Sequence, residues 1–248
     1  HYHLEIFLNA QPITPDQHLA FSLWFGEIEP HASAKRLPGH PEILPVIKEA
    51  EDRAANFGGI WHSDVSFHEA PPMGQILYAL EVPESGGDTI FVNMYHAYDA
   101  LSDGMKALLD GLKVIHTGER SYGASNSQVT LRQDQFSRSM DVQVKEDAAD
   151  EVSHPVVRTH PETGRKALYL GVQLVKRIVG ISPDDSTETL ERLYVHCTQP
   201  TFVHRHKWQK GDLVFWDNRC TMHAAPPYND QRFTPHMHRT TVVGDRPF

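Results

Sequence analysis

The sequence predicts a mainly β protein in which two sheets pack as a sandwich or jelly roll, with helices outside. Short strand-like segments outnumber helical ones, and they lack the regular strand–helix alternation of a parallel α/β sheet. The chain shows no repeat, low-complexity tract or linker. Its 248 residues, 40% of them hydrophobic, can bury one ample core, so we expect a single domain over residues 1–248.

Strand-like segments occur along the whole chain. In residues 3–9, Leu4, Ile6 and Leu8 share one face of an alternating pattern. Further strands are expected at 42–47, 61–67, 75–82, 89–93, 156–159, 167–170, 201–208, 212–216 and 237–243. The turn-forming residues 161–164 predict a hairpin between two of these strands.

Helices are expected where a capping residue precedes apolar residues at helical spacing. Residues 14–17 form a capping box with Pro15 at the first helical position, and apolar residues follow as far as Trp24, before Gly26. Other helical segments are expected at 95–101, at 102–112 and from Ser182 onward. Residues 121–150 are polar without a steady period, so we expect a long loop or lid.

Charge and cysteine content exclude several classes of function. With 32 acidic and 23 basic residues the net charge is −9, and no basic stripe offsets it, so we expect no nucleic-acid or membrane partner. Cys197 and Cys220 cannot form a disulfide framework. The chain begins at His1 without a methionine, so we expect a missing N-terminal segment. We expect a cytoplasmic protein.

Histidine and aspartate residues suggest a metal site. His62 and Asp64 lie two apart in a strand-like segment, so both side chains should project from one face. About one such pair is expected by chance, and a surface pair is the alternative. His223 lies beyond the apolar strand 212–216 and could meet the pair across the sandwich. Two histidines and one carboxylate form the facial triad of non-haem Fe(II) oxygenases, which leaves three coordination positions open.

Five motifs resemble, in order and spacing, those of the taurine dioxygenase and 2,4-dichlorophenoxyacetate dioxygenase family; they lie at 61–67, 86–89, 154–161, 216–223 and 238–241. Within that family, residues 114–123 and 220–223 look most like the aryloxyalkanoate dioxygenases that attack phenoxypropionate herbicides. The resemblance implies a double-stranded β-helix, a jelly roll of the cupin type, that binds Fe(II) and 2-oxoglutarate.

The resemblance also implies roles for single residues. His62, Asp64 and His223 are expected to be the Fe(II) ligands and so the catalytic residues. Thr89 is expected to donate a hydrogen bond to a carboxylate of 2-oxoglutarate. Trp216 is expected to pack near the metal, and an ordinary core tryptophan is the alternative.

The anion-binding residues depart from the family pattern at one position. His31 and Val65 are expected on the substrate side, although His31 could equally be a solvated loop residue. Family members carry two arginines on the last strand, four residues apart. The first binds the far carboxylate of 2-oxoglutarate, and the second reaches the substrate anion. Arg239 matches the second, but Pro235 replaces the first. Arg232 could take that role or be exposed, or Arg239 could bind 2-oxoglutarate itself.

The resemblance therefore implies an oxidoreductase that uses O₂ to hydroxylate a small organic anion and releases succinate and CO₂. We expect an aryloxyalkanoate substrate, whose hydroxylation leads to ether cleavage in the catabolism of an aromatic compound. An alkylsulfonate or alkyl sulfate is the alternative substrate. Two alternatives of other classes are a zinc hydrolase with the same ligands and a non-catalytic jelly-roll binding module. We expect the protein to be a homo-oligomer.

Overall fold

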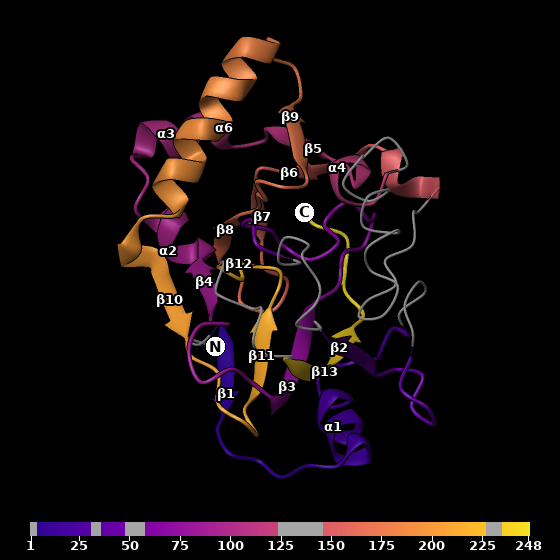
Figure 1. Cartoon of the computed structure of the whole chain (residues 1–248). Coiled ribbons are helices and arrows are strands. Elements are labelled where there is room, and N and C mark those ends of the chain that lie inside the picture. Colours follow the sequence, from indigo (N-terminus) through magenta and orange to yellow (C-terminus); the bar gives the residue numbers. More distant parts are fainter. Residues whose placement is uncertain (1–3, 31–35, 48–57, 124–145, 227–234) are drawn as a thin grey trace.

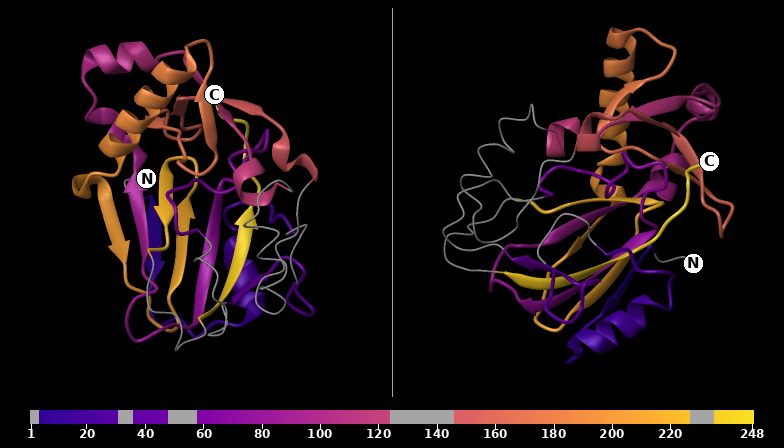
Figure 2. Two further views of the ribbon diagram at one scale, coloured as in Figure 1. Left: turned by 45° about the horizontal axis from the view of Figure 1, so that its top comes forward. Right: turned by 90° about the vertical axis from the view of Figure 1, so that its right-hand side faces the viewer.

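The computed structural model describes residues 4–30, 36–47, 58–123, 146–226 and 235–248 (Figure 1). Two antiparallel sheets form its centre (Figure 2). The larger sheet has the strand order β1 (Glu5–Leu8), β11 (Leu213–Asp217), β3 (Gly74–Glu81), β13 (His236–Val242) and β2 (Leu44–Ile47). The second sheet has the order β10 (Val203–His206), β4 (Thr89–Asn93) and β12 (Thr221–Ala224). The predicted mainly β jelly roll is confirmed.

Alternation along the strands divides the apolar core into layers. On β11, Val214 and Trp216 point to the inside and join Phe91 of the second sheet in one buried cluster. Leu213 and Phe215 point to the outer face and pack in a different cluster. A third cluster covers the outer face of the second sheet and includes residues of the long helix α6 (Pro183–Cys197). The inside of the jelly roll is therefore lined by large aromatic side chains.

Helix α1 (Pro15–Ser22) lies outside the larger sheet (Figure 2). The predicted capping box is present, because the Thr14 side chain accepts from the Gln17 backbone amide while the Gln17 side chain accepts from the Thr14 amide. The helix ends at Ser22, so the expected apolar face stops short of Trp24, which is 81% exposed. Ser22 is buried and bonds Thr240 of β13, 2.7 Å between the hydroxyl oxygens.

The remaining helices lie at one end of the sheets (Figure 1). They are α2 (Met94–Asp99), α3 (Asp103–Leu109), α4 (Glu119–Tyr122) and α6, with short 3-10 turns at Glu146–Ala149 and Pro200–Phe202. The helix expected from Ser182 onward is α6, and its Leu190 and Leu193 are buried. Among the described residues, no helix has the length and apolar character needed to cross a membrane.

The structure corrects one predicted strand and adds four strands that were not predicted. Residues 61–67 are not a strand: only His62 makes a β bridge, and residues 64–67 form a turn because Val65 adopts a left-handed φ of 48°. Strands that the sequence did not predict are β5 (Lys113–His116), β6 (Val152–Pro155), β9 (Val175–Ile178) and β12. The predicted hairpin is present as β7 (Val157–Thr159) and β8 (Lys166–Leu168). Most of the expected loop 121–150 lies outside the described residues.

Candidate functional site

His62 begins the loop of residues 62–68, the ligand loop, and lies beside His223 of β12 in an isolated antiparallel bridge. Their backbones exchange two hydrogen bonds, of 3.0 Å from the His62 amide and 2.8 Å from the His223 amide. This bridge places the imidazole centroids 4.2 Å apart. The Nδ1 atom of His62 lies 2.7 Å from the Ile60 carbonyl oxygen, which only accepts hydrogen bonds, so in the neutral imidazole Nε2 carries the free lone pair.

Asp64 brings its carboxylate between these two imidazoles. Its Oδ1 lies 3.6 Å from His62 Nε2, and its Oδ2 lies 3.6 Å from His223 Nε2. These separations are too long for hydrogen bonds. All three residues are less than 10% exposed: 8% for His62, 7% for Asp64 and 9% for His223. The structure therefore brings together the three residues that the sequence singled out, on a turn and a strand instead of on one strand face.

Burial and mutual attraction set the protonation of this cluster. Burial alone would raise the pKa of Asp64, but the neighbouring His223 and His62 hold it well below its usual value, so the carboxylate is charged. Burial lowers the pKa of His223 to about 3 despite the attraction of Asp64, so this imidazole is neutral. Burial opposes the charged form of His62 too, but Asp64 outweighs it and raises the His62 pKa.

The donor set suits a divalent transition metal. One ligand atom from each residue lies within 4.8 Å of the other two, and Asp64 Oδ2 is buried without a hydrogen-bond partner in the described structure. A buried carboxylate oxygen without a hydrogen-bond partner lowers the stability of the folded protein. A cation bound by this oxygen and the two imidazoles would remove that destabilisation. Two imidazoles and one carboxylate, with no cysteine, match an open catalytic site better than a closed structural zinc site.

Arg239 of β13 lies close enough for its positive charge to act on His62, Asp64 and His223. This charge opposes protonation of each, although the net pKa shift of His62 is upward because of Asp64. On β13 Arg239 pairs in register with Leu77 of β3, and its Nε atom is buried without a hydrogen-bond partner in the described part of the chain. A half-buried arginine with an unused buried donor near a cation site is suited to a second, anionic group at that site.

Thr89 begins β4 and carries a hydroxyl whose orientation is restricted. The Trp208 indole Nε1 donates to the Thr89 Oγ1 across 2.9 Å. Because this oxygen already accepts one bond, the hydroxyl proton is available to an acceptor elsewhere. The sequence did not predict Trp208 as part of the site, since the indole reaches Thr89 from a distant segment.

Trp216 packs beside the metal cluster in the interior of the jelly roll. It is 3% exposed, and its ring centroid lies 5.0 Å from that of His223 and 5.7 Å from that of Phe91. Both sequence interpretations therefore apply, because Trp216 is a core residue and also lies against a candidate ligand.

The other residues predicted from the sequence fall into two groups. Val65 is described, half-buried in the turn directly after Asp64, and Pro235 stands at the start of the segment that leads into β13. His31 and Arg232 lie outside the described residues.

The ligand loop is held from both sides by residues that sequence reasoning gave no role. Asn218 bonds the backbone of Asp64, with 2.8 Å between its Oδ1 and the Asp64 amide nitrogen and 3.0 Å between its Nδ2 and the Asp64 carbonyl oxygen. On the other side His116 Nδ1 lies 2.9 Å from Ser66 Oγ, and His154 Nε2 lies 2.9 Å from the His68 carbonyl oxygen. These contacts link segments more than 45 residues apart, which spacing patterns do not reveal.

A second group of potential ligands, His160, Asp217 and Cys220, is already satisfied internally. His160 Nε2 lies 3.0 Å from Asp217 Oδ2, and its Nδ1 accepts from the Glu162 and Thr163 amides. Both imidazole nitrogens are therefore used. Burial raises the pKa of the Cys220 thiol, which keeps it protonated. We interpret this group as structural support.

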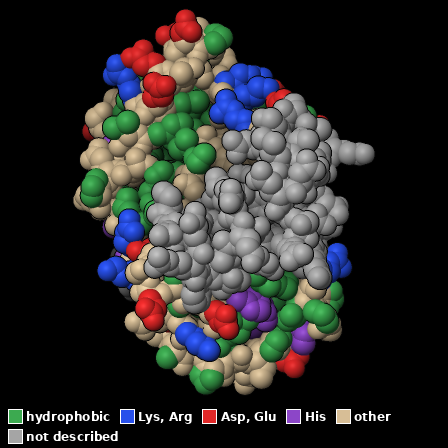
Figure 3. All heavy atoms as spheres, viewed as in Figure 1, with side chains coloured by type: hydrophobic (Ala, Val, Ile, Leu, Met, Phe, Trp, Pro, Cys, Tyr) green, Lys and Arg blue, Asp and Glu red, His purple; other side chains and the backbone are tan. Residues whose placement is uncertain are grey.

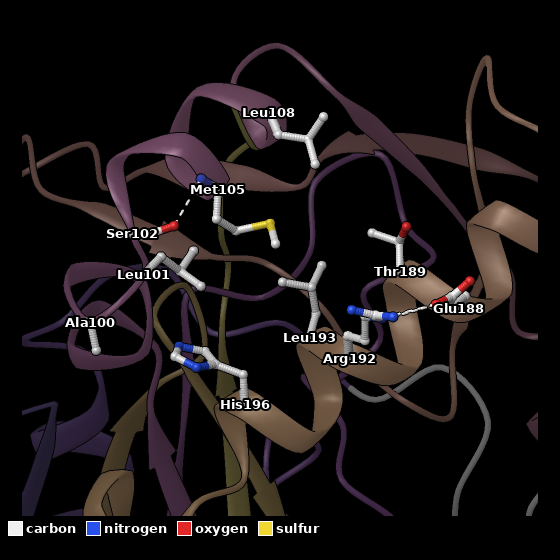
Figure 4. A pocket seen from close by; sticks show the side chains of 10 residues that line it. All are labelled: Ala100, Leu101, Ser102, Met105, Leu108, Glu188, Thr189, Arg192, Leu193 and His196. Carbon is white, nitrogen blue, oxygen red and sulfur yellow. Dashed lines mark hydrogen bonds and ion pairs between the residues drawn. The ribbon is translucent and has the colours of Figure 1, made fainter.

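One surface pocket lies among the described residues, away from the metal cluster. A pocket of about 430 Å³ lies between α3 and α6, where Met105 and Leu193 face one another (Figure 4). It is lined by the Glu188–Arg192 ion pair and contains none of the metal-cluster residues. On the face drawn in Figure 3, side chains of both charges are interspersed, and no basic stripe crosses the coloured part.

Comparison with known proteins identifies a family. The family model described as taurine catabolism dioxygenase TauD, TfdA family matches residues 1–241. The chain is 34% identical to an alpha-ketoglutarate-dependent 2,4-dichlorophenoxyacetate dioxygenase of Burkholderia sp. (strain RASC), over 97% of this chain and 82% of that one. It is 35% identical to an alkylsulfatase of Acinetobacter baylyi, over 96% and 72%.

A solved structure provides a further likeness. The crystal structure of AAD-2 in complex with Mn(II) and N-oxalylglycine superposes with a TM-score of 0.77 and 34% identity, over 98% of this chain and 84% of that one. The chain thus belongs to the TauD/TfdA family, and it is a 2-oxoglutarate-dependent dioxygenase that uses Fe(II) and O₂.

Proposed function

We propose that His62, Asp64 and His223 hold the Fe(II) of this dioxygenase. The observation that carries the proposal is the buried convergence of their ligand atoms within 4.8 Å, with a carboxylate oxygen otherwise lacking a partner. When bound, Fe(II) supplies O₂ activation coupled to decarboxylation of 2-oxoglutarate. Three protein ligands leave room for the bidentate cosubstrate and for O₂.

Thr89 and Arg239 are proposed to orient 2-oxoglutarate. The Thr89 hydroxyl, fixed by Trp208, donates to one carboxylate. Arg239 offers its guanidinium, whose Nε is buried without a partner in the described structure, to an anion bound beside the metal, either a cosubstrate carboxylate or the substrate anion. Arg232 is the other candidate for the far carboxylate, because Pro235 provides no donor at the position of the family arginine.

The Trp208→Phe variant tests the Thr89 role. Removing the indole donor frees the hydroxyl to rotate while the aromatic packing is largely kept. We expect KM for 2-oxoglutarate to rise about 5- to 10-fold, equivalent to one hydrogen bond, with little change in kcat. Initial rates of succinate formation at varied 2-oxoglutarate measure the effect. An unchanged KM in this variant, together with a raised KM in Thr89→Val, would show that Thr89 acts without the indole.

The proposed substrate is a small organic anion, and we favour an aryloxyalkanoate. The likeness to the 2,4-dichlorophenoxyacetate dioxygenase supports this class. The ligand loop also contributes a buried aromatic ring, Phe67, whose centroid lies 5.5 Å from that of Tyr122. We propose that Val65 and His31 contact the substrate, Val65 because it directly follows the ligand Asp64. The equally strong likeness to an alkylsulfatase makes an alkyl sulfate or sulfonate the second candidate.

A substrate panel tests this preference. Purified enzyme with Fe(II), ascorbate and 2-oxoglutarate is incubated with aryloxyacetates, both enantiomers of aryloxypropionates, alkyl sulfates and taurine. We expect succinate release that is stimulated most by an aryloxyalkanoate, with an equal amount of phenol formed. Stimulation by alkyl sulfates alone, with release of sulfate, would overturn the substrate proposal and leave the metal site intact.

A further inference from the structure

Asn218 takes the place of a missing β-strand partner beside the metal ligand Asp64. Its Oδ1 accepts from the Asp64 amide and its Nδ2 donates to the Asp64 carbonyl, so one side chain bonds both polar groups of this residue. The Nδ2 atom also donates to the Pro72 carbonyl oxygen across 3.2 Å. The Ser63 hydroxyl lies 3.0 Å from Asn218 Oδ1 and 2.8 Å from its carbonyl oxygen. Asn218 is 1% exposed.

The backbone at Asp64 needs such a partner because no strand ladder continues past His62. The bridge to His223 covers one residue only, and the chain then enters a turn through Val65. A left-handed φ is unfavourable for a β-branched residue, so the turn persists only where surrounding contacts hold it. Asn218 bonds the backbone of Asp64, the residue directly before Val65. These bonds fix the backbone from which the Asp64 carboxylate projects.

The residues on either side of Asn218 are themselves anchored. Asp217 accepts from His160 and, through both carboxylate oxygens, from the Arg219 guanidinium. Arg219 also pairs with Glu162, 2.9 Å between charged atoms. The backbone amide nitrogen of Asn218 donates to the Met73 carbonyl oxygen across 2.9 Å. The amide side chain thus projects from a turn whose two ends are fixed by charged groups.

We propose that Asn218 is a positioning residue that sets the metal affinity of the site by holding Asp64, and that the His160–Asp217–Arg219 network exists to support it. This inference rests on the proposed assignment of Asp64 as a metal ligand. Groups that orient metal ligands typically change affinity by about 10- to 100-fold when they are removed.

The Asn218→Asp variant isolates the two donated bonds. The new side chain keeps its size and can still accept from the Asp64 amide, but it turns a second oxygen toward the carbonyls of Asp64 and Pro72. We expect the Kd for Co(II), titrated anaerobically and followed by visible absorption, to rise about 10- to 100-fold. The Co(II) spectrum should change as well, because the carboxylate moves relative to the two imidazoles.

Matched variants separate positioning from general loss of stability. Asn93→Asp makes the same exchange at a residue whose side chain accepts a bond from the His96 amide at the start of α2, a role that an aspartate keeps. Leu109→Ala removes a fully buried side chain far from the cluster and lowers the melting temperature. We expect both to bind Co(II) with less than a twofold change in Kd.

The outcomes distinguish this inference from the proposed function. Wild-type affinity and spectrum in Asn218→Asp would overturn the positioning role alone, and so would an equal loss of affinity in Leu109→Ala. Failure of the wild-type protein to bind Co(II) would overturn the metal site itself. If Asn218→Asp does not fold, Ser63→Ala decides: it removes only the hydroxyl that fixes the amide, and we expect Kd to rise about 2- to 10-fold, whereas an unchanged Kd refutes the proposal.

Discussion

Replacing His62, Asp64 or His223 by alanine is expected to abolish 2-oxoglutarate turnover. Each residue supplies one of three converging ligand atoms, so its loss leaves a site that cannot hold Fe(II) in an open three-ligand arrangement. Since residues that only orient ligands change affinity or activity by about 10- to 100-fold, loss of a ligand itself should exceed 100-fold. Succinate formation and the iron content of dialysed protein measure the two consequences.

His204→Ala is the matched control for these variants. His204 lies on β10 of the same jelly roll and is exposed. We expect it to retain both iron and turnover. Retention of more than a tenth of wild-type activity by His62→Ala or His223→Ala would show that the ion is held elsewhere.

Acidification from pH 7 to pH 5 is expected to remove about 4 kcal/mol of stability through two buried histidines alone. Burial lowers the pKa of His18 to about 4 and that of His116 to about 3. As the pH falls below the ordinary histidine pKa of 6.5, these histidines become protonated in the unfolded chain but stay neutral in the folded protein. The free energy of unfolding therefore decreases until the pH reaches the pKa of the folded state. Each pH unit in this window costs about 1.4 kcal/mol per histidine.

This loss is large, because the whole stability of a domain is about 5–15 kcal/mol. Burial and His236 shift the pKa of His238 in the same direction, to about 4. Urea unfolding at pH 7 and pH 5, with a chelator present, measures the effect. In His116→Gln the difference between the two pH values should shrink by about 2 kcal/mol. An undiminished difference in His116→Gln would contradict the assignment.

The sequence predicted the meeting of His62, Asp64 and His223 correctly but gave the wrong local structure for it. A strand was expected at residues 61–67, and a β-branched residue such as Val65 usually favours extended backbone. In the structure that residue has a φ of 48°, and the loop turns. Tertiary contacts from Asn218 and His116 override the local preference, and no pattern within the loop itself reveals them.

Strands were predicted correctly where alternate residues pack on opposite faces of a sheet, because this gives the sequence a period of two. The alternation of β11 is visible in the sequence, because Val214 and Trp216 fill the interior while Leu213 and Phe215 cover the outer face. The strands β5, β6 and β9 have only four residues each and form a separate small sheet. Burial does not alternate along them: three successive residues are buried on β5, and only the two end residues are buried on β9, so no period of two is visible and these strands were missed.

The positioning residues were beyond sequence reasoning for a related reason. Asn218 lies inside a recognised motif, but its partner Asp64 is 154 positions away. Trp208 lies 119 positions from Thr89. Hydrogen bonds of this range depend on how the two sheets face each other, which periodicity and spacing do not encode.

The spectrum of the protein with anaerobic Fe(II) and 2-oxoglutarate tests the central claim most directly. Chelation of iron by the 1-carboxylate and 2-keto oxygens should give a weak metal-to-ligand charge-transfer band in the visible region for the wild-type protein. The band should vanish in His62→Ala and in Asp64→Ala. A band of wild-type strength in both variants, or its absence from the wild-type protein loaded with iron, would contradict the account.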